Sequence, residues 1–313
     1  MNSPHPEAVA ALDIGTNTML LLVSELDAQG DLRVVEDHCR TARLGEGLAR
    51  SGSIAPQAFE RGLAVLLEYS RKLQQLGIAP ARTRAVGTAV LRRAANARAF
   101  VDAVQRTTGL CIEIISEAEE AELGARAVRG ELGTERAAVI DVGGGSTEYA
   151  SAVGTQRLSI PIGAVVLAES GLPLAQQQAL ASSLAKAFPP GDARGETAVI
   201  LGGTAVNLAC LELGLARFDP QAAEGARLPP DSARRWAGRL AALPAAERLR
   251  LPIESERAAI LLEGLLCLAA AVERLEPFSL RVSGRGLRYG LARALLQKNS
   301  HGPPHSSFGG SLD

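Results

Sequence analysis

Two short segments, roughly 130 residues apart, have nearly the same pattern: AALDIGTNT at residues 10–18 and VIDVGGGST at residues 139–147. Each is an apolar run that contains an aspartate, Asp13 or Asp141, followed by a turn of Gly, Ser, Thr or Asn and a second strand-like run. One such turn is a common hairpin. Two copies in one chain predict a duplicated fold in which the turns face each other across a cleft.

The composition of the two turns indicates an anion site. Turns that present several backbone N–H groups suit phosphate, and three successive glycines weaken a strand, which favours close approach of a ligand to the backbone. The candidate phosphate-binding residues are Gly15, Thr16, Asn17, Thr18, Gly143, Gly144, Gly145, Ser146 and Thr147. A Rossmann fingerprint is excluded because it needs a helix after the glycines, whereas residues 147–153 alternate like a strand.

The two aspartates indicate a metal ion. An aspartate at the end of a buried strand costs free energy unless it meets a metal, water or a hydrogen-bond donor. Asp13 and Asp141 are therefore candidate metal ligands, and the pair of turns is interpreted as a phosphate-and-metal clamp. The alternative is that either carboxylate only braces its own turn by accepting backbone N–H bonds.

Composition narrows the class of protein. The 313 residues suffice for two domains, and 47% hydrophobic with 3% aromatic content predicts mainly aliphatic cores. No apolar run reaches membrane-spanning length and no signal-peptide pattern opens the chain, so we expect a cytoplasmic protein without a membrane partner. The net charge of −1 gives no field for nucleic acid. Scattered cysteines predict buried free thiols: Cys39, Cys111, Cys210 and Cys267.

Apolar periodicity predicts two successive lobes. In the first lobe, strands are expected near 8–14, 18–25, 32–40, 84–88 and 111–115, and helices near 56–76, 96–108 and 116–129. In the second, strands are expected near 137–142, 147–153, 156–160, 197–201 and 280–283, helices near 163–170, 174–187, 255–275 and after 202 and 286, and a surface loop at 219–230. The predicted domains are 1–123 and 124–298, the last helix packing back on the first lobe, and 299–313 as a disordered tail.

The duplicated turns resemble those of the actin, sugar-kinase and heat-shock ATPase superfamily. Further motifs narrow the resemblance, over residues 8–297, to the exopolyphosphatase and guanosine pentaphosphate phosphohydrolase (Ppx/GppA) family. They are RLGEG at 43–47, VGTAVLR at 86–92, IISEAEEA at 114–121, DVGGGSTE at 141–148 and PIGA at 161–164. The resemblance implies an α/β fold of two actin-like, ribonuclease H-like lobes with an interlobe cleft, in a short form that lacks the helical extension of longer relatives.

The resemblance also assigns roles to individual residues. Glu120 matches the catalytic glutamate that orients or deprotonates water, and Arg92 matches an arginine that neutralises the transferring phosphoryl group. Asp141, Glu148 and Asp13 would hold Mg²⁺ or another divalent cation. The alternatives are that acidic residues stabilise a helix N-terminus and that Arg92, like its neighbour Arg93, is a surface residue.

The implied activity is hydrolysis of the terminal phosphoanhydride of inorganic polyphosphate, releasing orthophosphate. Guanosine pentaphosphate 5′-phosphatase, a stringent-response activity, is the runner-up. An ATPase or kinase of the superfamily, or a non-catalytic phosphate sensor, also stays open. The glycine junctions at 202–204 and 283–290 are compatible with nucleotide binding or with simple helix–strand packing, and the sequence leaves open whether the protein is a homodimer.

Overall fold

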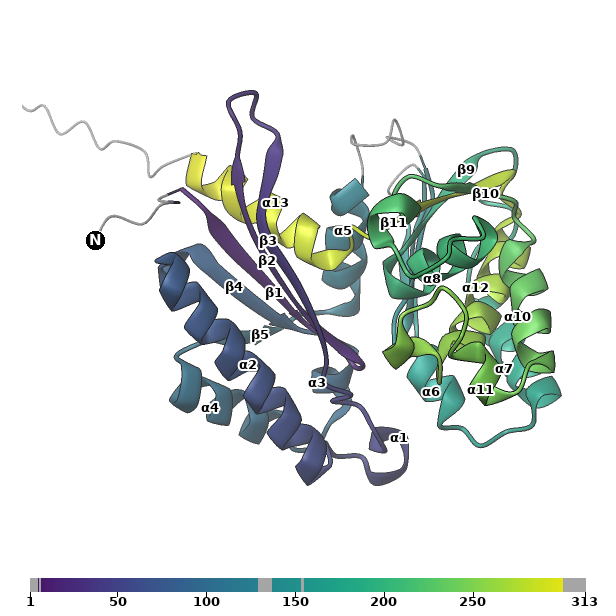
Figure 1. Cartoon of the computed structure of the whole chain (residues 1–313), viewed down its shortest axis with the longest axis horizontal. Helices are drawn as coiled ribbons and strands as arrows, with labels where there is room; N and C mark the ends of the chain where they lie inside the picture. The colour runs from purple at the N-terminus through teal and green to yellow at the C-terminus, as the bar shows by residue number, and fades with distance from the viewer. Residues whose placement is uncertain (1–4, 6, 129–136, 153–154, 301–313) are drawn as a thin grey trace, which may run out of the picture.

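The computed structural model describes residues 5, 7–128, 137–152 and 155–300, which form two lobes, each built on one β-sheet (Figure 1). The predicted tail at 299–313 falls mostly outside the described residues, while residues 299 and 300 end the last helix. The predicted α/β class is confirmed, and both sheets combine parallel and antiparallel strands.

The first sheet has the strand order β3-β2-β1-β4-β5. Its strands are β1 Val9–Ile14, β2 Thr18–Leu26, β3 Leu32–Thr41, β4 Thr83–Gly87 and β5 Ile112–Ile114. β1, β2 and β3 form an antiparallel meander, whereas β4 and β5 continue parallel to β1. The parallel strands end at the same edge of the sheet as β1, so Asp13 and the residues that follow β4 share that edge.

The second sheet repeats this arrangement in the order β10-β11-β9-β6-β7-β8. Its strands are β6 Val139–Val142, β7 Thr147–Ala150, β8 Arg157–Ile160, β9 Thr197–Leu201, β10 Arg227–Leu228 and β11 Ser279–Ser283. Again the first three strands are antiparallel and the next two are parallel to the first, with β10 as an added edge strand. The duplication predicted from the two turns is therefore present in the topology.

The two hairpin turns close in the same way. Gly15 N donates to Thr18 O at 3.0 Å, and Gly143 N donates to Ser146 O at 3.0 Å. A strand follows each turn, as predicted, so the glycines do not open a helix as they would in a Rossmann unit. The hydrogen bonds fix the register that brings each strand-end aspartate beside its turn.

Helices cover the outer face of each sheet (Figure 1). In the first lobe they are α2 Pro56–Leu76 and α4 Ala97–Thr108, while α1 Leu48–Ser51 and α3 Ala89–Arg93 are short helices at the junction with the second lobe. In the second they are α6 Ala164–Ala168, α7 Leu174–Ala185, α8 Gly202–Glu212, α9 Pro220–Ala223, α10 Ser232–Ala242, α11 Ala245–Arg248 and α12 Leu261–Leu275. α2 begins at a proline and ends before Gly77 in the left-handed region, as its sequence predicts.

Two helices, α5 Glu117–Val128 and α13 Leu287–Ser300, lie between the two sheets (Figure 1). Their apolar side chains join Val9 of the first sheet and Val199 of the second in one buried cluster. α13 contacts β1 and β2, although the chain enters it from β11 of the second sheet. The expected domain boundary at 123–124 falls within α5, and the division remains a prediction.

The structure corrects two predictions in the second lobe, one for a surface loop and one for the start of a long apolar helix. Residues 219–230 are not a plain loop, because the Asp219 side chain accepts from two backbone N–H groups at the start of α9 and β10 pairs with β11. α12 begins at Leu261 rather than near 255, after a 3₁₀ turn at Ser255–Arg257. Both segments hold tertiary contacts that their local composition does not reveal.

The prediction for the cysteines is half right. All four are free thiols, and Cys210 and Cys267 are buried as predicted. Cys39 and Cys111 are exposed, which is a correction: Cys39 lies on edge strand β3, and Cys111 immediately precedes edge strand β5. Across the described residues, no helix has the length and apolarity needed to cross a membrane.

The crossing of α5 and α13 depends on Gly290. A Cβ added there would lie 1.9 Å from the Leu123 carbonyl oxygen, a backbone atom that cannot move alone. We expect Gly290→Ala to lower the free energy of unfolding by about 1–3 kcal/mol or more, measured by urea denaturation. Gly238→Ala in α10 is the matched control, because a Cβ there meets nothing; it should stabilise slightly. Equal stability of the two variants would contradict the packing.

Candidate active site

The two hairpin turns touch each other across the cleft. A Cβ added to Gly145 would lie 2.5 Å from Thr16 Oγ1, and one added to Gly144 would lie 3.2 Å from Thr16 Cβ and 3.3 Å from Asn17 Cβ. From the sequence, we expect the three glycines at 143–145 to allow a ligand to approach the backbone closely. The structure gives a second reason: without side chains at 144 and 145, the opposite turn can pack directly against this backbone.

Most of the predicted site residues line one pocket at this junction. They are Asp13, Gly15, Thr16, Asn17, Thr18, Glu120, Asp141, Gly143, Gly144, Gly145, Ser146 and Glu148. Thr147 is not among these residues: its side chain is fully buried, and its hydroxyl donates to Ile162 O at 2.7 Å, so its part in phosphate binding stays a prediction. Arg92, expected to neutralise the transferring phosphoryl group, is not among the lining residues but contacts Glu120, and its role stays a prediction.

Glu120 and Arg92 form a largely buried ion pair at the start of α5. Arg92 Nη1 donates to Glu120 Oε2 at 2.7 Å and to the Ile115 carbonyl at 3.0 Å. The side chains are 15% and 17% exposed, and within the described chain the buried Arg92 Nη2 has no hydrogen-bond partner. Burial raises the pKa of Glu120 above its usual range, against the opposing charge of Arg92.

The neighbouring Glu119 points elsewhere. Its carboxylate pairs with Arg84 at 2.7 Å and is 38% exposed, and its backbone N–H donates to Ser116 Oγ at 3.2 Å, the N-cap contact that the sequence predicts. Successive residues on a helix diverge by about 100°. Only Glu120 of this pair therefore faces the cleft, and Glu119 offers a matched control for it.

Three more carboxylates gather in the pocket. Burial, with the charges of Glu120 and Asp141, raises the pKa of Asp13 to about 8. Burial raises the pKa of Asp141 to about 6 and that of Glu148 well above its usual range. Among the described residues, no hydrogen-bond donor reaches the Asp13 or Asp141 carboxylate. The alternative that these aspartates brace their turns is therefore not supported.

The donor set fits a hard divalent cation that arrives with phosphate. The described residues contain no group of three or more His, Cys, Asp and Glu side chains placed to hold a metal by themselves. Magnesium, however, binds through one or two carboxylates completed by water and phosphate oxygens. The Asp13 and Asp141 carboxylates accept no hydrogen bond from the described residues and lie beside the glycine turns. They could therefore supply the carboxylate ligands, and water and phosphate oxygens would complete the coordination shell.

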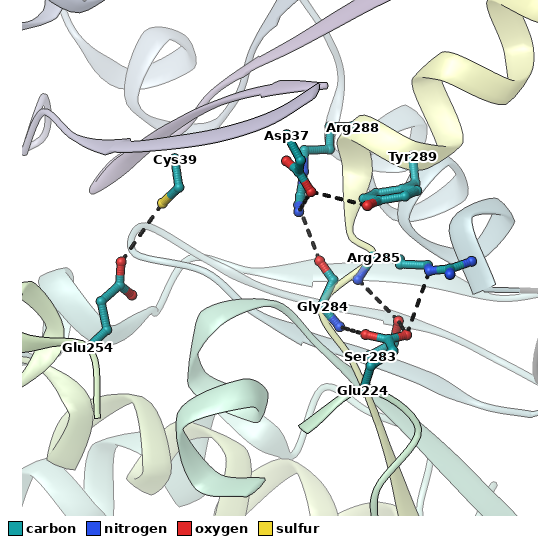
Figure 2. Close-up of polar contacts among 9 residues, drawn as sticks. All are labelled: Asp37, Cys39, Glu224, Glu254, Ser283, Gly284, Arg285, Arg288 and Tyr289. Carbon is teal, nitrogen blue, oxygen red and sulfur yellow. Dashed lines mark hydrogen bonds and ion pairs between the residues drawn. The ribbon is translucent and has the colours of Figure 1, made fainter. Parts of the chain in front are cut away.

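Two arginines that were not assigned from the sequence complete the pocket lining: Arg257 and Arg288. Arg257 Nη2 lies 3.4 Å from Thr18 Oγ1 of the first lobe. Arg288, at the start of α13, donates to both carboxylate oxygens of Asp37 at 2.9 Å (Figure 2). Their charges oppose the effect of burial on the pKa of Asp141. Arg288 lies in the glycine junction at 283–290, whose role the sequence left open, whereas no local pattern marks Arg257.

Further contacts join the lobes around the turns. Arg93 was expected at the surface; it is exposed, but its Nη1 also donates to Gly145 O at 3.0 Å. The backbone N–H of Gly47, in the RLGEG segment, donates to both Glu169 oxygens at 2.9 and 3.0 Å. These bonds link Arg93 of α3 and the loop at Gly47, both in the first lobe, to the second lobe. Residues of both lobes therefore form the pocket.

The chain is similar in sequence to known proteins over most of its length. Residues 22–299 match the model of the Ppx/GppA phosphatase family. The chain is 33% identical over 245 residues to Exopolyphosphatase 2 of Mycobacterium tuberculosis, covering 71% of this chain and 76% of that protein.

Solved structures give the same result for the fold. The crystal structure of the Aquifex aeolicus member of the Ppx/GppA family is 30% identical, with a TM-score of 0.77, covering 94% of this chain and 99% of that one. An exopolyphosphatase from Cytophaga hutchinsonii has a TM-score of 0.82 at 20% identity, covering 93% and 98% of the two chains, and supports the fold alone. The two-lobed fold implied by the resemblance is confirmed.

The raised pKa of Asp13 predicts how stability depends on pH. Between about pH 4 and 8 the folded chain keeps a proton that the unfolded chain has released, so the stabilisation is present at low pH and is lost as pH rises. Asp13→Asn should reduce this loss by at least about 1.4 kcal/mol, the value of one pKa unit, and the rest remains because the pKa values of Asp141 and Glu148 are also raised. Urea denaturation at pH 5 and 8 in chelator measures it.

Asp102→Asn is the control for this comparison, because Asp102 pairs with exposed Arg98 outside the pocket. It should keep the wild-type dependence on pH. If Asp13→Asn lost as much stability as the wild type between the two pH values, Asp13 would not hold the proton.

Proposed function

Because this chain belongs to the Ppx/GppA phosphatase family and is a phosphoanhydride hydrolase, we propose that it removes the terminal phosphate of inorganic polyphosphate. One observation carries the proposal: the buried Glu120 carboxylate, paired with Arg92, lines the pocket in which the two turns meet. The likeness to Exopolyphosphatase 2 of Mycobacterium tuberculosis supports polyphosphate as the substrate. Guanosine pentaphosphate is the second candidate, supported by the family match.

The turns would bind the terminal phosphoryl group. Gly15 N and Gly143 N close the turns, so the donors would be the other backbone N–H groups of residues 16–18 and 144–147, one set from each lobe. The Ser146 side chain is buried beside Glu148, with which it hydrogen-bonds. The substrate's last anhydride oxygen would then lie between the lobes, with its phosphorus open to attack from the side of Glu120.

Glu120 would act as the general base. The oxygen of a water molecule attacks the terminal phosphorus while one water proton passes to the Glu120 carboxylate. The bond from phosphorus to the bridging oxygen breaks, its electron pair stays on the shortened polyphosphate, and orthophosphate leaves. The raised pKa makes Glu120 a stronger base than an exposed glutamate. Arg92 keeps the carboxylate oriented, and no covalent intermediate is needed.

A divalent cation, Mg²⁺ by preference, would neutralise charge on the phosphate oxygens when bound. Asp141, Glu148 and Asp13 are the residues that would hold it, one or two directly and the rest through water. Four pocket carboxylates face two lining arginines, Arg257 and Arg288. A polyanion entering this pocket therefore needs cations or protons to offset the repulsion.

The role of Glu120 is tested by Glu120→Gln, which keeps the size of the side chain and removes the base. We expect kcat on polyphosphate to fall by about 10²- to 10⁴-fold, with little change in KM. Phosphate release from polyphosphate, guanosine pentaphosphate and ATP measures both the mechanism and the substrate. Glu119→Gln is the control and should keep wild-type activity; full activity in Glu120→Gln would refute the mechanism.

The role of the aspartates is tested by cation binding without turnover. Mg²⁺ titrated into the chelated protein with orthophosphate should raise the melting temperature. In Asp141→Asn the half-saturating Mg²⁺ concentration should rise by about tenfold or more, because a direct or water-mediated ligand is lost. Asp102→Asn again serves as the control. Identical Mg²⁺ curves for wild type and Asp141→Asn would remove Asp141 from the cation site.

A further inference from the structure

Two glycine junctions lie side by side at the edge of the catalytic pocket. β9 runs through Gly202 into α8, and its parallel neighbour β11 runs through residues 284–286 into α13, with Ser283 opposite Leu201. Gly202, Gly203 and Gly286 line the pocket. Ligands of α/β sheets bind beyond the carboxyl ends of parallel strands, and glycine turns before helices bind phosphate. By these rules, a nucleoside diphosphate could extend from the pocket onto the two junctions.

The first junction is covered by an arginine of the same chain. A Cβ added to Gly203 would lie 2.1 Å from Arg257 Cζ, so the guanidinium lies directly on this glycine. Arg257 Nε donates to Glu254 Oε2 at 2.8 Å. The side chain of the fully buried Asn207 donates to Gly203 O at 2.8 Å and accepts from Glu254 N at 2.7 Å. These bonds fix Gly203 and Glu254 relative to each other, and Glu254 in turn fixes the Arg257 guanidinium over Gly203.

The second junction already holds a carboxylate. Glu224 Oε2 accepts from Gly284 N at 2.6 Å, and Glu224 Oε1 accepts from Ser283 Oγ at 2.7 Å (Figure 2). Arg285 Nε lies 3.8 Å from Glu224 Oε1. Backbone N–H, hydroxyl and guanidinium groups converge on Glu224 as they would on a phosphate. The Glu224 carboxylate thus occupies the hydrogen-bond donors, Ser283 Oγ and Gly284 N, that a bound phosphate would need.

We propose that Glu224 is a specificity-determining residue, which closes the 283–286 junction to the nucleoside end of a substrate. A phosphate placed there would face the Glu224 charge and would find Ser283 and Gly284 already bonded. With Arg257 on the neighbouring junction, groups of the chain itself occupy both junctions, so neither is open to hold the nucleoside end, and the site disfavours nucleoside polyphosphates. This inference rests on the proposed function, because it names which phosphoanhydride that site selects.

Glu224→Ala should open the junction. Isothermal titration with ADP, without turnover, is expected to show a Kd at least about tenfold lower than in the wild type. The ratio of kcat/KM for ATP to kcat/KM for polyphosphate should rise by a similar factor. Glu212→Gln is the control, since Glu212 also pairs with an arginine, Arg235, and with Trp236 in the same lobe; it should behave as wild type.

The outcomes separate this inference from the proposed function. A folded Glu224→Ala variant, judged by its melting curve, with wild-type ADP affinity and an unchanged ratio would overturn it. If that variant does not fold, Glu224→Gln, which keeps the size and removes the charge, must show the same gain. Low-micromolar ADP binding by the wild type would also overturn it. Absence of polyphosphate turnover would sink the proposed function, while the ADP titration would still decide the role of Glu224.

Discussion

The structure depends on one close contact, in which the turn at residues 15–18 packs against the glycines at 143–145. Each turn is closed by the same backbone hydrogen bond, so each lobe presents its N–H groups rigidly. Only glycine allows the two backbones to come this near. Because the turns meet, donors from both lobes and the aspartates that end β1 and β6 lie in a single pocket.

This proximity has an electrostatic cost that the chain offsets only in part. Four carboxylates line the pocket, and burial raises the pKa of each. Arg92, Arg257 and Arg288 oppose the repulsion, but they are also tied to Ile115, Glu254 and Asp37. The remaining charge is best met by a cation that enters with phosphate. In the proposed function, the substrate and the cation would therefore bind this pocket together.

The sequence predicts those features of the fold that depend on neighbouring residues, such as strands, tight turns and helix starts. Strand alternation, glycine turns and the capping serine at 116 gave the two sheets, their hairpins and the start of α5. It also gave Glu120 rather than Glu119 for the pocket, through the family motif. It failed where partners are far apart in the chain: Arg257 reaches Thr18 across 239 residues, and Glu224 reaches Gly284 across 60. The sequence also did not show that the Thr147 hydroxyl bonds Ile162 O in the neighbouring segment.

The most direct test of the central claim is a crystal structure with Mg²⁺ and a polyphosphate analogue that cannot be hydrolysed. We expect the terminal phosphoryl group to accept hydrogen bonds from backbone N–H groups of both turns, with Glu120 holding a water opposite the bridging atom. A phosphoryl group bound to one turn alone, or a Glu120 carboxylate turned away from the phosphorus in that complex, would contradict it.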